Sequence, residues 1–232
     1  MPEMMDLADY NADKKFKIES QNFYRTYIRN DEETKKGVIE ARKDWRMDGN
    51  PSLDNFEAWF NRSLNDNQRF LNKARDADKF SENLIEYDAD DPFWQTYKGN
   101  VTMAVYKKSD DSFVGFEIYK SVGRVHYTKF RVILPSLRSQ GIGTEVDIAG
   151  AKYVFNVAKY EKSFSRVAVA QMNKTPSVAY SDKTEPSDTE DISRGRPIRY
   201  ATIETTAEGF NAWLNLSTNE AHKNAFFKYS ES

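Results

Sequence analysis

The chain has 232 residues, of which 39% are hydrophobic and 14% aromatic, and this supports a substantial folded core. Its 34 Lys and Arg residues nearly balance 36 Asp and Glu residues, so the net charge of -2 gives no nucleic-acid signal. The absence of cysteine excludes disulfides, thiolate metal sites and a cysteine nucleophile, and with only two histidines we expect no bound metal.

Membrane insertion and export are not indicated either. No apolar run approaches the roughly 20 residues that span a bilayer. The start, MPEMMDLADYNADKK, is acidic and lacks the basic and then apolar pattern of a signal peptide. We therefore expect a cytoplasmic protein without a membrane partner.

The N-terminal part reads as one strand followed by helices. Residues 16–28 are rich in aromatics and predict a strand, although a helix fits nearly as well. A helix is predicted over 30–49, with Asn30 as its cap and Gly49 at its end. A second helix is expected to begin at Pro51, and its apolar face consists of Leu53, Phe56, Phe60 and Leu64.

The hydrophobic period changes to two at Val101. Residues 101–108, 113–121 and 124–134 predict three consecutive antiparallel strands with short polar turns between them. The third strand leads through Pro135 and the segment RSQGIG, residues 138–143, into an amphipathic helical pattern.

A strand that meets a helix start through a glycine turn can hold a phosphate. Unpaired backbone N–H groups and the positive end of the helix dipole point at one spot there. Two better-known phosphate loops do not fit, because a dinucleotide fingerprint needs a glycine at Val146 and a nucleotide-triphosphate loop needs Gly-Lys-Ser/Thr.

The segment RSQGIG resembles the acyl-CoA loop of the GNAT acetyltransferase superfamily, whose pattern is Arg/Gln-x-x-Gly-x-Gly/Ala. A predicted strand at 166–170, then Asn173, and Tyr180 seven residues later follow in the order seen in that family. The resemblance implies a mixed α+β fold with a central, mostly antiparallel twisted sheet flanked by helices. It also implies an N-acetyltransferase that uses acetyl-CoA as co-substrate.

The resemblance further implies the residues that bind the cofactor. Backbone N–H groups are expected to hold the CoA diphosphate at Ser139, Gln140, Gly141, Ile142, Gly143 and Thr144. Arg138 either adds positive charge there or is a solvated turn residue. The main chain at Ile133 is expected to bind the pantetheine arm and to polarise the thioester carbonyl. The alternative is an ordinary core strand that meets a helix through a glycine turn.

The catalytic residues implied by the resemblance match the family for the general acid but not for the general base. Tyr180 is the expected general acid for the leaving thiolate, and Asn173 a cofactor contact; the alternatives are a packed tyrosine and a helix cap. Many relatives place a Glu base where this chain has Tyr127. His126 has a suitable pKa range, but strand alternation turns it to the other face unless a bulge intervenes. Glu117 can act through a water, and both residues can equally be structural.

The whole chain, 1–232, is expected to form one GNAT-like domain. Residues 1–98 form a largely helical part that shapes the acceptor side, and 99–232 contain the central sheet, the CoA loop and the C-terminal part. The acidic, Ser/Thr-rich stretch 181–197 predicts a mobile loop where the family has a Gly-Phe pair. A strand at 197–205 and an aromatic helical tail follow.

Three functions fit these patterns. The first is direct transfer of an acetyl or related acyl group from acyl-CoA to an amine acceptor, which is a small molecule or a protein. The second is a module that binds CoA without catalysis. The third is a structural or interaction protein that docks a partner through its N-terminal helices.

Overall fold

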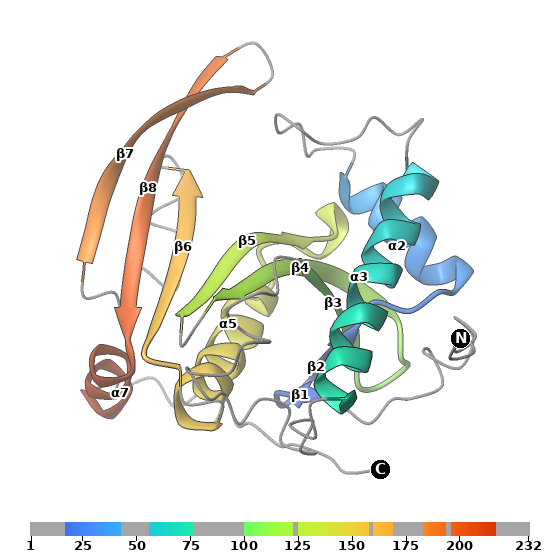
Figure 1. Ribbon diagram of the computed structural model, residues 1–232, viewed down its shortest axis with the longest axis horizontal. Helices are drawn as coiled ribbons and strands as arrows, with labels where there is room; N and C mark the ends of the chain where they lie inside the picture. The colour runs from blue at the N-terminus through green and yellow to red at the C-terminus, as the bar shows by residue number, and fades with distance from the viewer. Residues whose placement is uncertain are drawn as a thin grey trace.

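The computed structural model describes residues 17–42, 56–76, 100–122, 125–157, 160–168, 183–193 and 196–216. Eight strands in this part form one sheet in the order β1-β2-β3-β4-β5-β6-β8-β7 (Figure 1). The strands are β1 (Ile18–Glu19), β2 (Phe23–Tyr27), β3 (Val101–Lys107), β4 (Phe113–Val122), β5 (Val125–Ile133), β6 (Lys162–Ala168), β7 (Lys183–Ser193) and β8 (Arg196–Thr206). Of the described pairings only β5 with β6 is parallel, so the expected mostly antiparallel sheet is confirmed.

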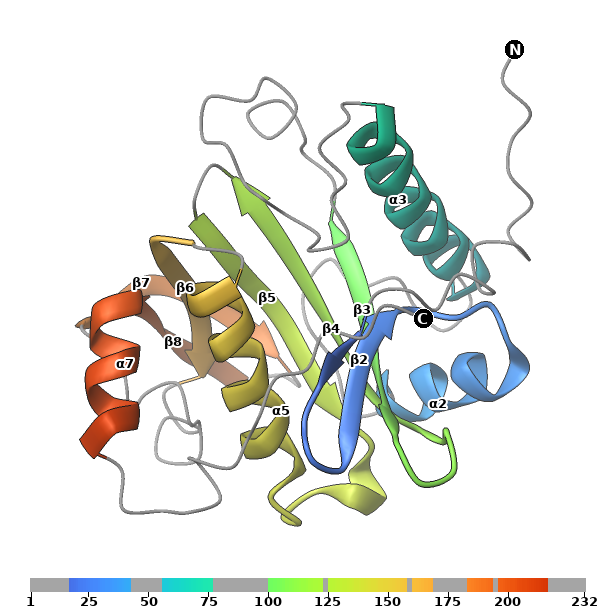
Figure 2. The ribbon, with the colours of Figure 1, turned by 90° about the horizontal axis from the view of Figure 1, so that it is seen from below.

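Helices cover both faces of this sheet. They are α2 (Glu32–Arg42), α3 (Phe56–Asp76), α5 (Ile142–Lys152), which continues as a π-helical turn (Tyr153–Val157), and α7 (Ala207–Leu216). Trp59 of α3 packs on Phe116 of β4 with ring centroids 5.9 Å apart. The next residue of β4, Glu117, faces the side of α5, because successive strand residues point to opposite faces. Figure 2 shows α3 and α5 on opposite sides of the central strands.

The N-terminal part contributes strands as well as helices. β2 pairs with β3 from Phe23 to Tyr27, so the strand interpretation of residues 16–28 is right and the helical one is wrong. Helix α2 is capped by Asp31 rather than Asn30, since the Thr34 N–H donates to Asp31 Oδ1 at 2.7 Å. The expected end at Gly49 and the start at Pro51 lie outside the described residues.

The loop predicted for the acidic stretch 181–197 is wrong for its described residues 183–193. These residues form strand β7, which pairs antiparallel with β8 and extends with it beyond the end of β6 (Figure 1). Polar composition argued for a loop, but the main-chain ladder to β8 satisfies the backbone regardless of side chains. Pro186 is tolerated because β7 is an edge strand and its register shifts after this residue. The strand expected at 166–170 begins earlier, at Lys162, and is described to Ala168.

A buried stripe on α3 attaches this helix to the sheet. Phe56, Phe60 and Leu64 recur every fourth residue and are buried, as their spacing predicts. Asn67 continues the stripe and is 0% exposed. Its Nδ2 donates to the Thr102 carbonyl at 2.7 Å, and its Oδ1 accepts from the Thr102 N–H at 3.0 Å. The side chain therefore pairs with β3 as a further strand would.

Replacing Asn67 with Ala is expected to lower the free energy of unfolding by about 2 to 3 kcal/mol, because the buried Thr102 N–H loses its acceptor. Urea denaturation measures this change. Asn65→Ala is the matched control, since Asn65 is exposed on the same helix. Equal losses in the two variants would show that the Asn67 amide does not hold α3 to the sheet.

Candidate active site

The turn between β5 and α5 has the geometry of an open helix start. After β5 the chain passes through a short 3-10 turn, Pro135–Leu137, and reaches Gly141 with φ 79°. This left-handed conformation favours glycine. Ser139 also has a positive φ, 63°, which sequence reasoning did not foresee. Non-glycine residues in the left-handed conformation are strained, and they occur often at functional sites. The rest of the structure therefore holds Ser139 in a conformation that a serine does not favour.

The first amides of α5 have no acceptor within the helix. The first bond into the helix runs from the Glu145 N–H to the Gly141 carbonyl at 3.1 Å. The N–H groups of Ile142, Gly143 and Thr144 precede it and have no intrahelical acceptor. A Cβ built on Gly141 or Gly143 would meet nothing within 4 Å. These backbone donors therefore lie at the positive end of the α5 dipole, beside two glycines whose Cβ positions are not occupied by other protein atoms.

Strand β5 separates from β6 just before this turn. The two strands pair only from Val125 to Thr128, although β5 continues to Ile133. Figure 1 shows them beginning side by side and diverging. The Leu134 N–H donates to Val114 of β4 at 2.9 Å. Because adjacent N–H groups of a strand point opposite ways, the N–H of Ile133 points into the opening on the β6 side.

Arg138 reaches back to the same opening. Its Nε donates to the Ile133 carbonyl at 3.0 Å, and the side chain is exposed. The guanidinium group thus bonds back to the end of β5, and both expected roles of Arg138, added charge at a phosphate and a solvated turn residue, stay predictions.

A β-bulge changes the alternation of β5. Ile118 is opposite Phe130 and Tyr119 is opposite Thr128, so Lys129 is an additional residue in β5. The sequence argument against His126 required uninterrupted alternation between this residue and Ile133, and the bulge removes that premise. The backbone of His126 lies in β5 opposite Ser121, while its side chain lies outside the described part of the structure.

Glu117 lies in a buried ion network. It is 1% exposed, and its Oε2 lies 3.2 Å from Arg25 Nη1 and 3.1 Å from Arg131 Nε. Arg131 also pairs with Asp147 of α5. Two guanidinium groups therefore contact the same carboxylate oxygen of Glu117. The network gives Glu117 the structural role that was the alternative, and its role as a base acting through water stays a prediction.

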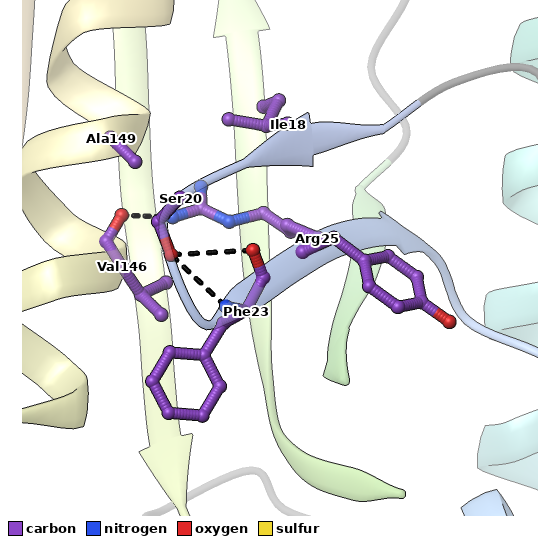
Figure 3. Close-up of a pocket in the computed structure, with 7 residues that line it drawn as sticks. Ile18, Ser20, Phe23, Arg25, Val146 and Ala149 are labelled. Carbon is purple, nitrogen blue, oxygen red and sulfur yellow. Dashed lines mark hydrogen bonds between the residues drawn. The ribbon is translucent and has the colours of Figure 1, made fainter. Parts of the chain in front are cut away.

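Helix α5 is also bound to the first two strands, a connection that sequence reasoning missed. Glu145 accepts from Ser20 Oγ at 2.5 Å and from the Asn22 N–H at 2.8 Å. Arg25 Nη2 donates to the Val146 carbonyl at 3.0 Å (Figure 3). A cavity of about 10 Å³ lies beside these contacts and has room for about one water, so it is no cofactor site.

The remaining predicted site residues, Asn173 and Tyr180, lie outside the described residues. Within the described part, no cluster of His, Asp and Glu is arranged to hold a metal ion. The helices described are also too short or too polar to cross a membrane.

The fold that holds this site is the fold of the GNAT acetyltransferases. A probable acetyltransferase of the GNAT family from Chromobacterium violaceum has a TM-score of 0.54 at 10% identity, over 85% of this chain and 89% of that one. Spermidine N-acetyltransferase from Vibrio cholerae, solved with CoA and spermine, has a TM-score of 0.53 at 10% identity, over 82% and 98%. A GCN5-related N-acetyltransferase from Brucella melitensis has a TM-score of 0.51 at 12% identity, over 86% and 82%.

At these identities the similarity defines the fold and not the reaction. It agrees with the fold class expected from the strand order and the RSQGIG segment. No protein-family model matches the sequence, and no curated protein matches it significantly.

Proposed function

We propose that this protein transfers an acetyl or related acyl group from CoA to an amine. The observation that carries the proposal is the separation of β5 from β6 after Thr128, directly before the open amides of α5. An extended pantetheine arm can pair with the exposed main chain of β5, and the attached diphosphate then reaches the helix start. Gly143 supports this fit, because nothing in the surrounding protein requires a glycine there.

The proposed chemistry uses hydrogen-bond and proton donors around the thioester. The amine nitrogen attacks the thioester carbonyl, and the Ile133 N–H stabilises the oxyanion that forms. The carbon–sulfur bond then breaks, and the thiolate takes a proton from Tyr180. The amine gives up its own proton to a base, for which His126, or Glu117 acting through a water, is the candidate. Arg138 adds positive charge near the diphosphate, and Asn173 contacts the cofactor.

Tyr180→Phe is expected to lower kcat about 100-fold with little change in the KM for acetyl-CoA, because a general acid contributes roughly that much to the chemical step. Isothermal titration with acetyl-CoA measures binding, and thiol release measures turnover. The amine panel includes spermidine and spermine, since a protein with this fold is a spermidine N-acetyltransferase. Wild-type protein that neither binds acetyl-CoA nor releases thiol would overturn the proposal.

A CoA-binding module without catalysis is the second candidate. One observation favours it: Glu117, an acidic candidate for the base, is neutralised by two guanidinium groups. Tyr127 in place of the family's Glu points the same way. Acetyl-CoA binding without thiol release from any amine of the panel would identify this second function.

A further inference from the structure

Three consecutive residues of α5 are bound to the sheet directly after the open amides. Glu145 accepts from the turn between β1 and β2, the Val146 carbonyl accepts from Arg25 of β2, and Asp147 pairs with Arg131 of β5. The helix start is therefore fixed by contacts from two strands and from the turn between β1 and β2.

Arg131 differs from the other residues that hold α5. It lies in the part of β5 that has separated from β6, two residues before Ile133. Its guanidinium pairs with Asp147 through Nη1 and with Glu117 through Nε. A single side chain thus connects the strand proposed for pantetheine with the helix proposed for the diphosphate.

The network is closely fitted and balanced in charge. Arg25 and Arg131 face Glu117 and Asp147, and Arg25 and the two carboxylates are buried. A Cβ on Gly150 would come within 2.7 Å of Arg25 Nη2, so the helix approaches the guanidinium as closely as it can. Buried ion pairs add little net stability compared with apolar packing, whereas they can fix a geometry. Positioning is therefore the better explanation of this network.

We infer that the Arg131–Asp147 pair sets the position of the diphosphate amides relative to the pantetheine strand. This inference rests on the proposed function and names the residues that join the two halves of that site. Neither residue touches the ligand; Arg131 acts through the main chain of β5, and Asp147 acts through the start of α5. The pair matters only for a ligand that spans both halves at once.

The test is the charge-neutral double variant Arg131→Met with Asp147→Leu, in which Glu117 keeps Arg25 as its partner. Titration calorimetry measures CoA, and ligand NMR measures two fragments, ADP for the helix half and acetylpantetheine for the strand half. We expect CoA binding to weaken about tenfold with both fragments unaffected, because misplacement costs only the ligand that bridges the halves. The control is Lys162→Gln with Glu204→Gln, which removes an exposed ion pair between β6 and β8.

The other possible results each overturn either the inference about the Arg131–Asp147 pair or the proposed function. Unchanged CoA binding, or an equal loss for CoA and both fragments, would overturn the inference while the proposed function stands. Wild-type protein that fails to bind CoA would overturn the proposed function first. If the double variant does not fold, Arg131→Lys is used instead, because a lysine cannot donate to Glu117 and Asp147 in the fixed fork of an arginine. The same selective loss of CoA binding is then expected.

Discussion

Gly143→Leu is expected to weaken acetyl-CoA binding about 100-fold, because a side chain there blocks roughly two charge-assisted hydrogen bonds to a diphosphate. The fold should remain intact, since a Cβ at Gly143 meets nothing within 4 Å. Gly143 also lies inside the first turn of α5, where most residues are better helix formers than glycine. Titration calorimetry measures the binding, and a thermal melt measures the stability.

Asn215→Leu is the matched control for Gly143→Leu. Asn215 is exposed on α7, so this variant adds the same apolar side chain to a helix surface away from the site. Gly143→Ala gives an intermediate case, with binding reduced and stability raised by about 0.5 to 1 kcal/mol. If Gly143→Leu binds acetyl-CoA as tightly as wild type, the amides of α5 do not hold the diphosphate.

The local elements of this fold could be predicted because their signals are local. Alternation of apolar and polar residues predicts the three strands 101–108, 113–121 and 124–134. Each strand is present in the structure at nearly those bounds. The start of α5 is marked by Gly141, whose positive φ is the conformation that glycine accepts most readily. Neighbouring residues determine these features, so a pattern along the chain is sufficient.

The contacts within the site could not be predicted in the same way. Arg25, Glu117 and Asp147 come from distant parts of the chain, and no spacing rule connects them. The bulge at Lys129 is visible only once β5 is in register with β4. The sequence alone presents Glu117 as a carboxylate that could act as a base. The two guanidinium groups that contact it are known only from the structure. Strand β7 was missed for a related reason, because a polar strand gains its order from its neighbour, whereas β8 was expected at 197–205.

Glu117→Ala is expected to lower the free energy of unfolding by about 3 to 5 kcal/mol, which is the usual cost of leaving a buried charge without its partner. Arg25 is the residue left behind, at 5% exposure. Burial lowers the pKa of Arg25, and the charge of Glu117 is the largest influence that opposes this shift. Arg131 keeps Asp147, so the loss falls mainly on Arg25. Urea denaturation followed by circular dichroism measures the change.

Glu204→Ala is the control for this experiment, because Glu204 forms a more exposed ion pair with Lys162 and its removal should cost less than about 1 kcal/mol. The experiment also separates a structural from a catalytic role for Glu117. If Glu117 is structural, the Glu117→Ala variant is less stable than wild type. The activity that this variant loses then matches the fraction of the protein that is unfolded. A variant that stays as stable as wild type but loses kcat would instead identify Glu117 as the base, and the ion network would then be a means of tuning that carboxylate.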